Sequence, residues 1–276
     1  MSDHRPGSLC FLAAAFGAFV LILYGPIASI VILSFRRPAG GLALPLSGVS
    51  TDWFVNLFQR QAVGDLGGSF SRSLFVGLAN AGMTVLIATL ASYAFQRRFR
   101  GAALVFYLAI TRLIVPSILV SLGIGLMFQI LGIQPASYNF ALGAHLTWTL
   151  LIGLLIVFAG FNRFDRSWQE AARDHDVTPW QTFRHGVLPV TGPSLIGLFI
   201  LSITLGYDEF VRMLMTAGSL KALPLENHAM ATNVTTPVIY ALGSLTTGFS
   251  LAIVVTGLGA RALLHRGQHD KRVGKG

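Results

Sequence analysis

The feature that most constrains the fold is the length of the stretches that carry no charged residue. No charge interrupts Pro6–Phe35, and none lies within the 50 residues of Leu113–Asn162. A helix needs about 20 mostly apolar residues to cross the hydrocarbon core of a bilayer. Only 11% of the residues are charged, against roughly a quarter in soluble domains. The sequence therefore predicts an all-α membrane protein.

Six stretches are long and apolar enough to be predicted as membrane-spanning helices, and we expect residues 1–276 to form one transmembrane domain. Pro135 and the polar residues around it divide the longest apolar run into two spans, the first of which contains Arg112. A short amphipathic helix is expected at Ser50–Gln59, on the membrane surface. The predicted spans are residues 9–35, 73–96, 102–129, 140–161, 187–209 and 237–262.

The distribution of lysine and arginine predicts the orientation. With the N-terminus in the cytoplasm, thirteen of these residues lie in inside segments and six in outside segments, Arg212 among the latter. Such a bias is typical of inner-membrane proteins, whose short cytoplasmic loops are enriched in positive charge. Both termini are therefore predicted to be cytoplasmic. The basic residues form no stripe with interleaved aromatics, which argues against a nucleic-acid partner.

One polar stretch, Glu170–Pro189, separates the fourth and fifth predicted spans and lies on the cytoplasmic side. Its sequence is EAARDHDVTPWQTFRHGVLP, with five acidic or basic residues in the first seven positions. Ser167 and Glu170 have the S-x-x-E spacing of a helix capping box, and Thr178 and Gln181 have the equivalent T-x-x-Q spacing. Two short helices are therefore predicted in this loop.

The two helices are expected at Trp168–His175 and Pro179–His185. Pro179 falls at the first helical position, where its missing N–H is not needed. Asp176 lies at the break, where a left-handed residue is usual and aspartate is tolerated less well than glycine. Trp180 and Phe183 share one face of the second helix. This aromatic pair fits either the groove of a partner protein or the headgroup level of the membrane.

The polar stretch resembles the EAA loop found in the inner-membrane permeases of ABC importers, here residues 162–189. That pattern is E-A-A, three intervening residues, G, nine intervening residues, and then I-x-L-P. Asp176 replaces the usual glycine and Gly186 replaces the usual isoleucine. The matching residues are Glu170, Ala171, Ala172, Leu188 and Pro189.

The resemblance extends beyond the loop and is closest to the spermidine/putrescine type. It covers most of the chain from Ser73 to the sixth predicted span. The stretches that carry it include FRGAALVFYLAITRLIVPSILVSLGIGLMFQILGIQ, FDRSWQEAARD, SITLGYDEFV and LPLENHAMATNVTTPVIYALGSL. It implies the type I importer permease fold with cytoplasmic coupling helices.

In that family the EAA loop sits in a cleft of a separate ATPase subunit and couples ATP-driven closure to movement of the spans. The resemblance thus implies two ATPase subunits, a second permease subunit in a heterodimer or homodimer, and a periplasmic substrate-binding protein. The sequence contains no G-x-x-x-x-G-K-[ST] phosphate loop and no Cys/His cluster. We therefore expect no catalytic residue and no metal site in this chain, with ATP and magnesium bound by the partner.

Ionisable residues within or beside the spans are candidates for the substrate pathway. Placing a charged side chain in the bilayer costs free energy, so such residues usually have a function. Asp208 and Glu209 follow Tyr207 at the outer end of the fifth span, where carboxylates favour a cation. Alternatively, both mark a helix end in water. Arg112 pairs with one of them, extends toward the interface, or faces the pathway, where its charge would disfavour a polycation. His145 in the fourth span fits the pathway or simple helix packing.

The resemblance implies a permease that imports a small organic cation, a polyamine such as spermidine or putrescine, across the bacterial inner membrane. Other substrates carried by related permeases, including ferric iron, thiamine, opines, phosphonates and amino-acid-like compounds, remain open at this point. A secondary transporter that works without ATP is a third possibility. It would be expected to show inverted repeats and more carboxylates at the mid-membrane level, and neither is visible in the sequence.

Overall fold

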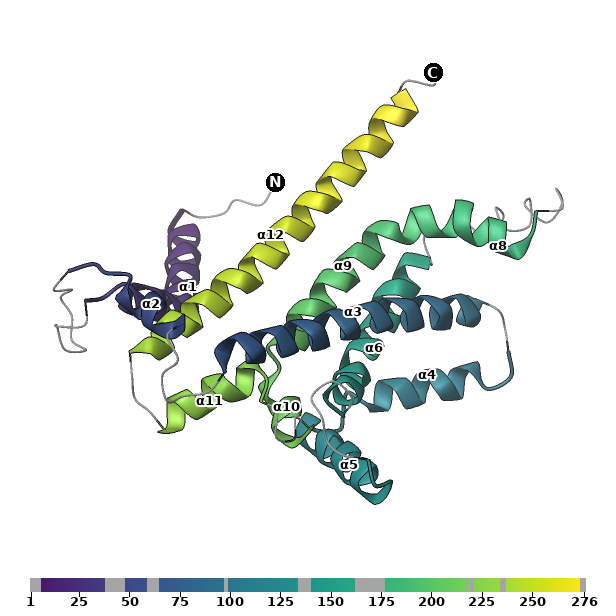
Figure 1. Cartoon of the computed structure of the whole chain (residues 1–276). Helices are drawn as coiled ribbons and strands as arrows, with labels where there is room; N and C mark the ends of the chain where they lie inside the picture. The colour runs from purple at the N-terminus through teal and green to yellow at the C-terminus, as the bar shows by residue number, and fades with distance from the viewer. Residues whose placement is uncertain are drawn as a thin grey trace. The chain divides into compact units, whose positions relative to one another are not determined.

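The computed structural model describes residues 6–37, 48–58, 65–96, 99–133, 140–161, 177–216, 218, 221–233 and 237–273. Over these ranges the named elements are helices (Figure 1), and an isolated β-bridge joins Arg36 and Val49. This agrees with the predicted all-α class. The helices are α1 (Pro6–Ser34), α2 (Asp52–Phe58), α3 (Leu66–Gln96), α4 (Ala102–Thr111), α5 (Ser117–Ile130), α6 (Phe140–Phe161), α8 (Pro179–Thr182), η1 (Phe183–Val187), α9 (Leu188–Tyr207), α10 (Phe210–Thr216), α11 (Leu223–Asn233) and α12 (Val238–Val273).

Among the described residues, five helical stretches are long and apolar enough to cross a membrane. They correspond to five of the six predicted spans, although α3 begins seven residues before the predicted start at residue 73. The predicted third span, 102–129, is not one helix. It consists of two shorter apolar helices, α4 and α5.

The break between α4 and α5 follows from the residues at the junction. At the C-terminus of α4 the backbone N–H of Arg112 donates to the carbonyl of Ala109 at 3.3 Å, and that of Leu113 donates to the carbonyl of Ile110 at 2.9 Å. Pro116 then occupies the N-cap position of α5. Proline lacks an N–H and disfavours helical backbone in the residue before it, so the helix cannot continue through Val115.

Residue contacts divide the chain into two units, 1–64 with 227–249, and 65–226 with 250–276. In the first unit, α2 confirms the predicted amphipathic helix, and the hydroxyl of Ser50 accepts a hydrogen bond from the N–H of Asp52 at its start. The rings of Phe35 and Phe54 lie 5.1 Å apart and hold α2 against the end of α1.

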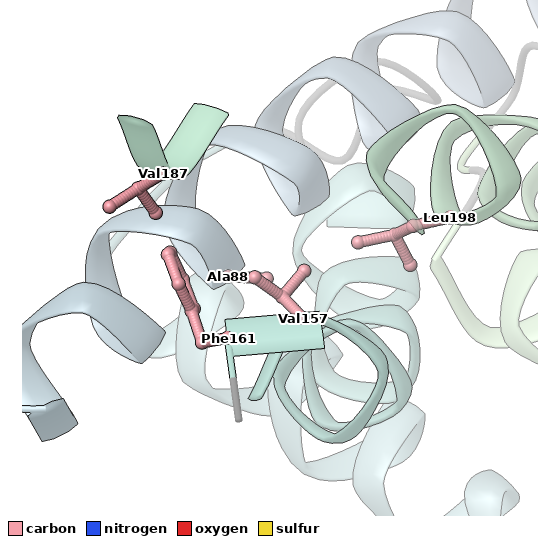
Figure 2. Packing of buried hydrophobic residues seen from close by; sticks show 5 residues of the cluster. All are labelled: Ala88, Val157, Phe161, Val187 and Leu198. Carbon is pink, nitrogen blue, oxygen red and sulfur yellow. The ribbon is translucent and has the colours of Figure 1, made fainter. Parts of the chain in front are cut away.

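The second unit is built on α3, α6 and α9, which pack against one another along their lengths. Small residues allow this close approach, as is usual where apolar helices meet in a membrane. A Cβ added to Gly153 on α6 would lie 3.0 Å from the side chain of Ala88 on α3. Figure 2 shows the apolar cluster at the α8 end of these helices, formed by Ala88, Val157, Phe161, Val187 and Leu198.

A buried polar network also joins the three helices. Asn80 on α3 donates through its amide to the carbonyl of Ser202 on α9, at 3.2 Å, and accepts from the hydroxyl of Thr149 on α6, at 2.9 Å. The hydroxyls of Thr84 and Thr149 are 2.7 Å apart. Because unpaired polar groups are costly in an apolar interior, these bonds fix which faces of the helices meet.

Candidate functional site

The coupling loop is described from residue 177 onward. Glu170, Ala171, Ala172 and Asp176, and the first predicted helix with its S-x-x-E box, lie outside the described residues. Their assignment to ATPase coupling stays a prediction.

The T-x-x-Q capping box is confirmed. The backbone N–H of Thr178 donates to the side-chain oxygen of Gln181 at 3.0 Å, and the backbone N–H of Gln181 donates to the hydroxyl of Thr178 at 3.3 Å. These reciprocal bonds satisfy two of the N–H groups that a helix start leaves without partners. Pro179 is the first residue of α8, as its missing N–H predicts.

The second loop helix does not end near His185 as predicted. It continues through the π-helical turn η1, which contains Gly186, directly into α9, which begins with Leu188 and Pro189. A proline in a helix loses one hydrogen bond and crowds the carbonyl four residues before it. The wider π turn accommodates this, and the N–H of Leu188 bonds to the carbonyl of Phe183, five residues back.

The two aromatic residues of this helix have different surroundings. The Phe183 ring meets the Tyr93 ring of α3 edge-on, with centroids 5.3 Å apart, and packs against the apolar cluster of the second unit. Trp180 stacks on Phe183 at 5.7 Å but stays 66% exposed. Phe183 therefore anchors the segment to the chain itself, and Trp180 presents the aromatic surface available to a partner.

Replacing Thr178 by alanine is expected to loosen the first turn of α8, because loss of a capping hydroxyl costs about 1 kcal/mol. Hydrogen exchange of peptides covering residues 177–183 should accelerate by about fivefold. Thr182→Ala is the matched control, since its hydroxyl only donates to the carbonyl of Thr178. Equal acceleration in both variants would show that the box does not stabilise the turn.

The predicted pathway residues do not all lie together. Tyr207 is buried, with its hydroxyl 2.8 Å from that of Ser250. His145 is 1% exposed and its Nδ1 lies 2.6 Å from the carbonyl oxygen of Ala141, as the packing interpretation expects. Asp208 is exposed just beyond the end of α9.

Arg112 and Glu209 do belong to one cluster, but through residues that the sequence interpretation missed. Glu209 forms a 2.6 Å ion pair with Arg212, not with Arg112. The guanidinium carbons of Arg212 and Arg112 lie 5.2 Å and 5.8 Å from the ring centre of Trp148 on α6. We call Arg112, Trp148, Glu209 and Arg212 the Trp148 cluster.

Arg212, which the charge count places in an outside segment, is buried in the structure. Its side chain is 4% exposed, because α10 packs against α5 and α6. The i,i+3 spacing of Glu209 and Arg212 is the signal that could have indicated the pair. Trp148 is the one tryptophan within a predicted span, yet nothing local indicates that two arginines approach it.

Comparisons with known proteins agree with this architecture, although no family model matches the chain. The chain is 28% identical over 261 residues to the spermidine/putrescine transport system permease protein PotC of Shigella flexneri, covering 94% of each. It is 27% identical over 260 residues to the putrescine transport system permease protein PotI of Escherichia coli strain K12, covering 90% of this chain and 89% of that protein.

A solved structure with the same fold is the bacterial alginate ABC transporter in complex with an alginate pentasaccharide-bound periplasmic protein. One of its chains superposes with a TM-score of 0.68 at 14% identity, covering 90% of this chain and 91% of that one. The likeness confirms the importer permease fold that the EAA pattern implied. Over most of its length the chain is therefore similar in sequence to permease proteins of the spermidine/putrescine type, and it is similar in fold to a chain of an ABC importer.

Proposed function

We propose that this protein is the permease subunit that forms part of the translocation pathway for a polyamine, spermidine or putrescine, in the bacterial inner membrane. The observation that carries the proposal is the similarity to PotC, which spans 94% of both chains. An alignment of this extent leaves out only a small part of either chain. The five long apolar helices fit a subunit that crosses the membrane several times.

The partners follow from the same proposal. Hydrolysis of ATP, with its magnesium, is assigned to separate ATPase subunits that receive the coupling loop on the cytoplasmic side, where both termini also lie. A second permease subunit completes the pathway, and a periplasmic binding protein delivers the substrate. The related alginate transporter was solved with a periplasmic protein bound, which supports this arrangement. The exposed Trp180 supports a docking role for the loop.

The test is affinity purification of the tagged chain from its native membrane in mild detergent, followed by identification of co-purifying chains. We expect an ATPase, a second permease and a periplasmic binding protein. The purified complex in liposomes should then import radiolabelled spermidine or putrescine when ATP is enclosed. Assembly of the complex without polyamine uptake would overturn the substrate assignment alone, and absence of an ATPase after crosslinking would overturn the whole proposal.

A further inference from the structure

The Trp148 cluster collects side chains from three separate parts of the fold. Arg112 lies in the break between α4 and α5, Trp148 on α6, and Glu209 and Arg212 at the start of α10. Trp148 is eight residues into α6, about 12 Å along the helix. In the predicted orientation the cluster would therefore lie below the outer end of the span, and ionisable groups at such a depth indicate a substrate pathway.

A carboxylate next to an aromatic ring is the combination that binds an organic ammonium group, through ion pairing and cation–π attraction. Glu209 and Trp148 provide this combination. The Arg212 guanidinium now occupies it, 2.6 Å from the carboxylate of Glu209 and 5.2 Å from the centre of the Trp148 ring. We propose that Trp148 and Glu209 bind an amine group of the transported substrate, and that Arg212 fills this site when substrate is absent. This inference rests on the proposed polyamine function.

The exposure of the Arg212, Glu209 and Trp148 side chains is compatible with replacement of the guanidinium by a substrate ammonium. The Arg212 side chain is 4% exposed, whereas the Glu209 side chain is 25% exposed and Trp148 is partly exposed. An arriving ammonium can therefore reach the carboxylate before the guanidinium leaves. Arg212 is carried on the seven-residue helix α10, so its long side chain or the short helix can shift to release the site.

Charge balance gives the second argument. Arg112 and Arg212 carry two positive charges that repel each other, and Asp208 and Glu209 carry two negative charges that also repel. The Glu209 carboxylate is already paired with the Arg212 guanidinium at 2.6 Å, so a substrate ammonium that pairs with this carboxylate must displace that guanidinium. Exchange of the Arg212 guanidinium for a substrate ammonium preserves neutrality. Arg112 stays in place, since its Nη1 donates to the carbonyl of Val115 at 2.9 Å.

The first test is uptake of radiolabelled spermidine by the complete complex in liposomes, at saturating loaded binding protein. Trp148→Leu removes the aromatic face and should lower the uptake rate by about three- to thirtyfold, the range that cation–π attraction supports. Trp148→Phe keeps a weaker aromatic face and should retain most of the rate. Stimulation of ATP hydrolysis by the binding protein should persist in both, which a general folding defect would not allow.

The second test is equilibrium binding of radiolabelled spermidine to the purified permease complex without binding protein. Arg212→Gln removes the resident cation and should tighten binding at least threefold, and adding Trp148→Leu should abolish the gain. Arg212→Lys, which keeps a competing cation, should bind like the wild type. Glu209→Gln should weaken binding in every background.

The outcomes separate the two proposals. A wild-type complex that imports no polyamine overturns the proposed function and this inference with it. Polyamine import by the wild type, with equal uptake by Trp148→Leu, overturns this inference alone. Weaker spermidine binding by Arg212→Gln would show that Arg212 only supports Glu209 structurally. If the Arg212→Gln complex does not assemble, the comparison of Trp148→Leu with Trp148→Phe decides the inference.

Discussion

Replacing Trp180 by alanine is expected to leave the complex assembled in the membrane and to abolish most of its transport-linked ATP hydrolysis. Trp180 is 66% exposed and held rigidly by stacking on Phe183, which is itself fixed on Tyr93. A preorganised, exposed tryptophan is the residue type that dominates protein interfaces, and its truncation typically costs about 2–4 kcal/mol. Binding-protein-stimulated hydrolysis of the reconstituted complex should fall by more than tenfold.

Phe58 supplies the matched control. It is also a large exposed aromatic residue, 77% exposed at the end of α2, and Phe58→Ala should leave coupled hydrolysis unchanged. Glu170→Ala, at the residue that begins the EAA pattern, should uncouple the complex as Trp180→Ala does. Normal coupled hydrolysis in both loop variants would rule out docking of an ATPase at this segment.

Valine in place of Gly77 should prevent α3 from packing on α9. A Cβ at this position would lie 3.0 Å from the Cβ of Tyr207 and 3.3 Å from its backbone nitrogen. Backbone atoms cannot move aside as a flexible side chain can, so the whole helix must shift, with loss of the neighbouring Asn80 bond to Ser202. Overpacking of this kind costs about 1–3 kcal/mol before the lost polar bond is added.

The measurement is the thermal stability and yield of the purified chain, followed by size-exclusion chromatography after heating. Gly82→Val is the control on the same helix, because nothing lies within 4 Å of a Cβ added there. We expect the Gly82 variant to match the wild type and the Gly77 variant to melt earlier or fail to assemble. Equal stability of the two would mean that α3 and α9 are not in the contact described.

The spans and the second capping box could be predicted because both depend on neighbours in the sequence. A charge-free apolar run has few folds open to it, and Thr178 and Gln181 are only three residues apart. The break in the third span could also be predicted, because Pro116 lies in the middle of that span. An apolar run of this length predicts one span with a kink at Pro116, and the structure shows a full break there because proline disfavours helical backbone in the residue before it.

The Trp148 cluster and the Asn80 network could not be predicted, because their members are far apart in the sequence. Arg112 and Arg212 are separated by a hundred residues, and Asn80 and Ser202 by 122. Hydropathy counts Arg212 as a loop residue, since it lies outside every long apolar run. Only the packing of α10 against α5 and α6 buries it.

The continuity of α8, η1 and α9 has a mechanical consequence. Their 4, 5 and 20 residues form one continuous helix from Pro179 to Tyr207, about 40 Å long. No loop interrupts this helix, so a displacement of its first turn is transmitted along it to Asp208 and Glu209. The π turn before Pro189 should bend more easily than a regular α-helix. Its hydrogen-bonded backbone ring is wider, and Pro189 has no backbone N–H to donate. We therefore expect this helix to bend around Pro189 and Pro193, in the half predicted to be cytoplasmic, rather than near Tyr207.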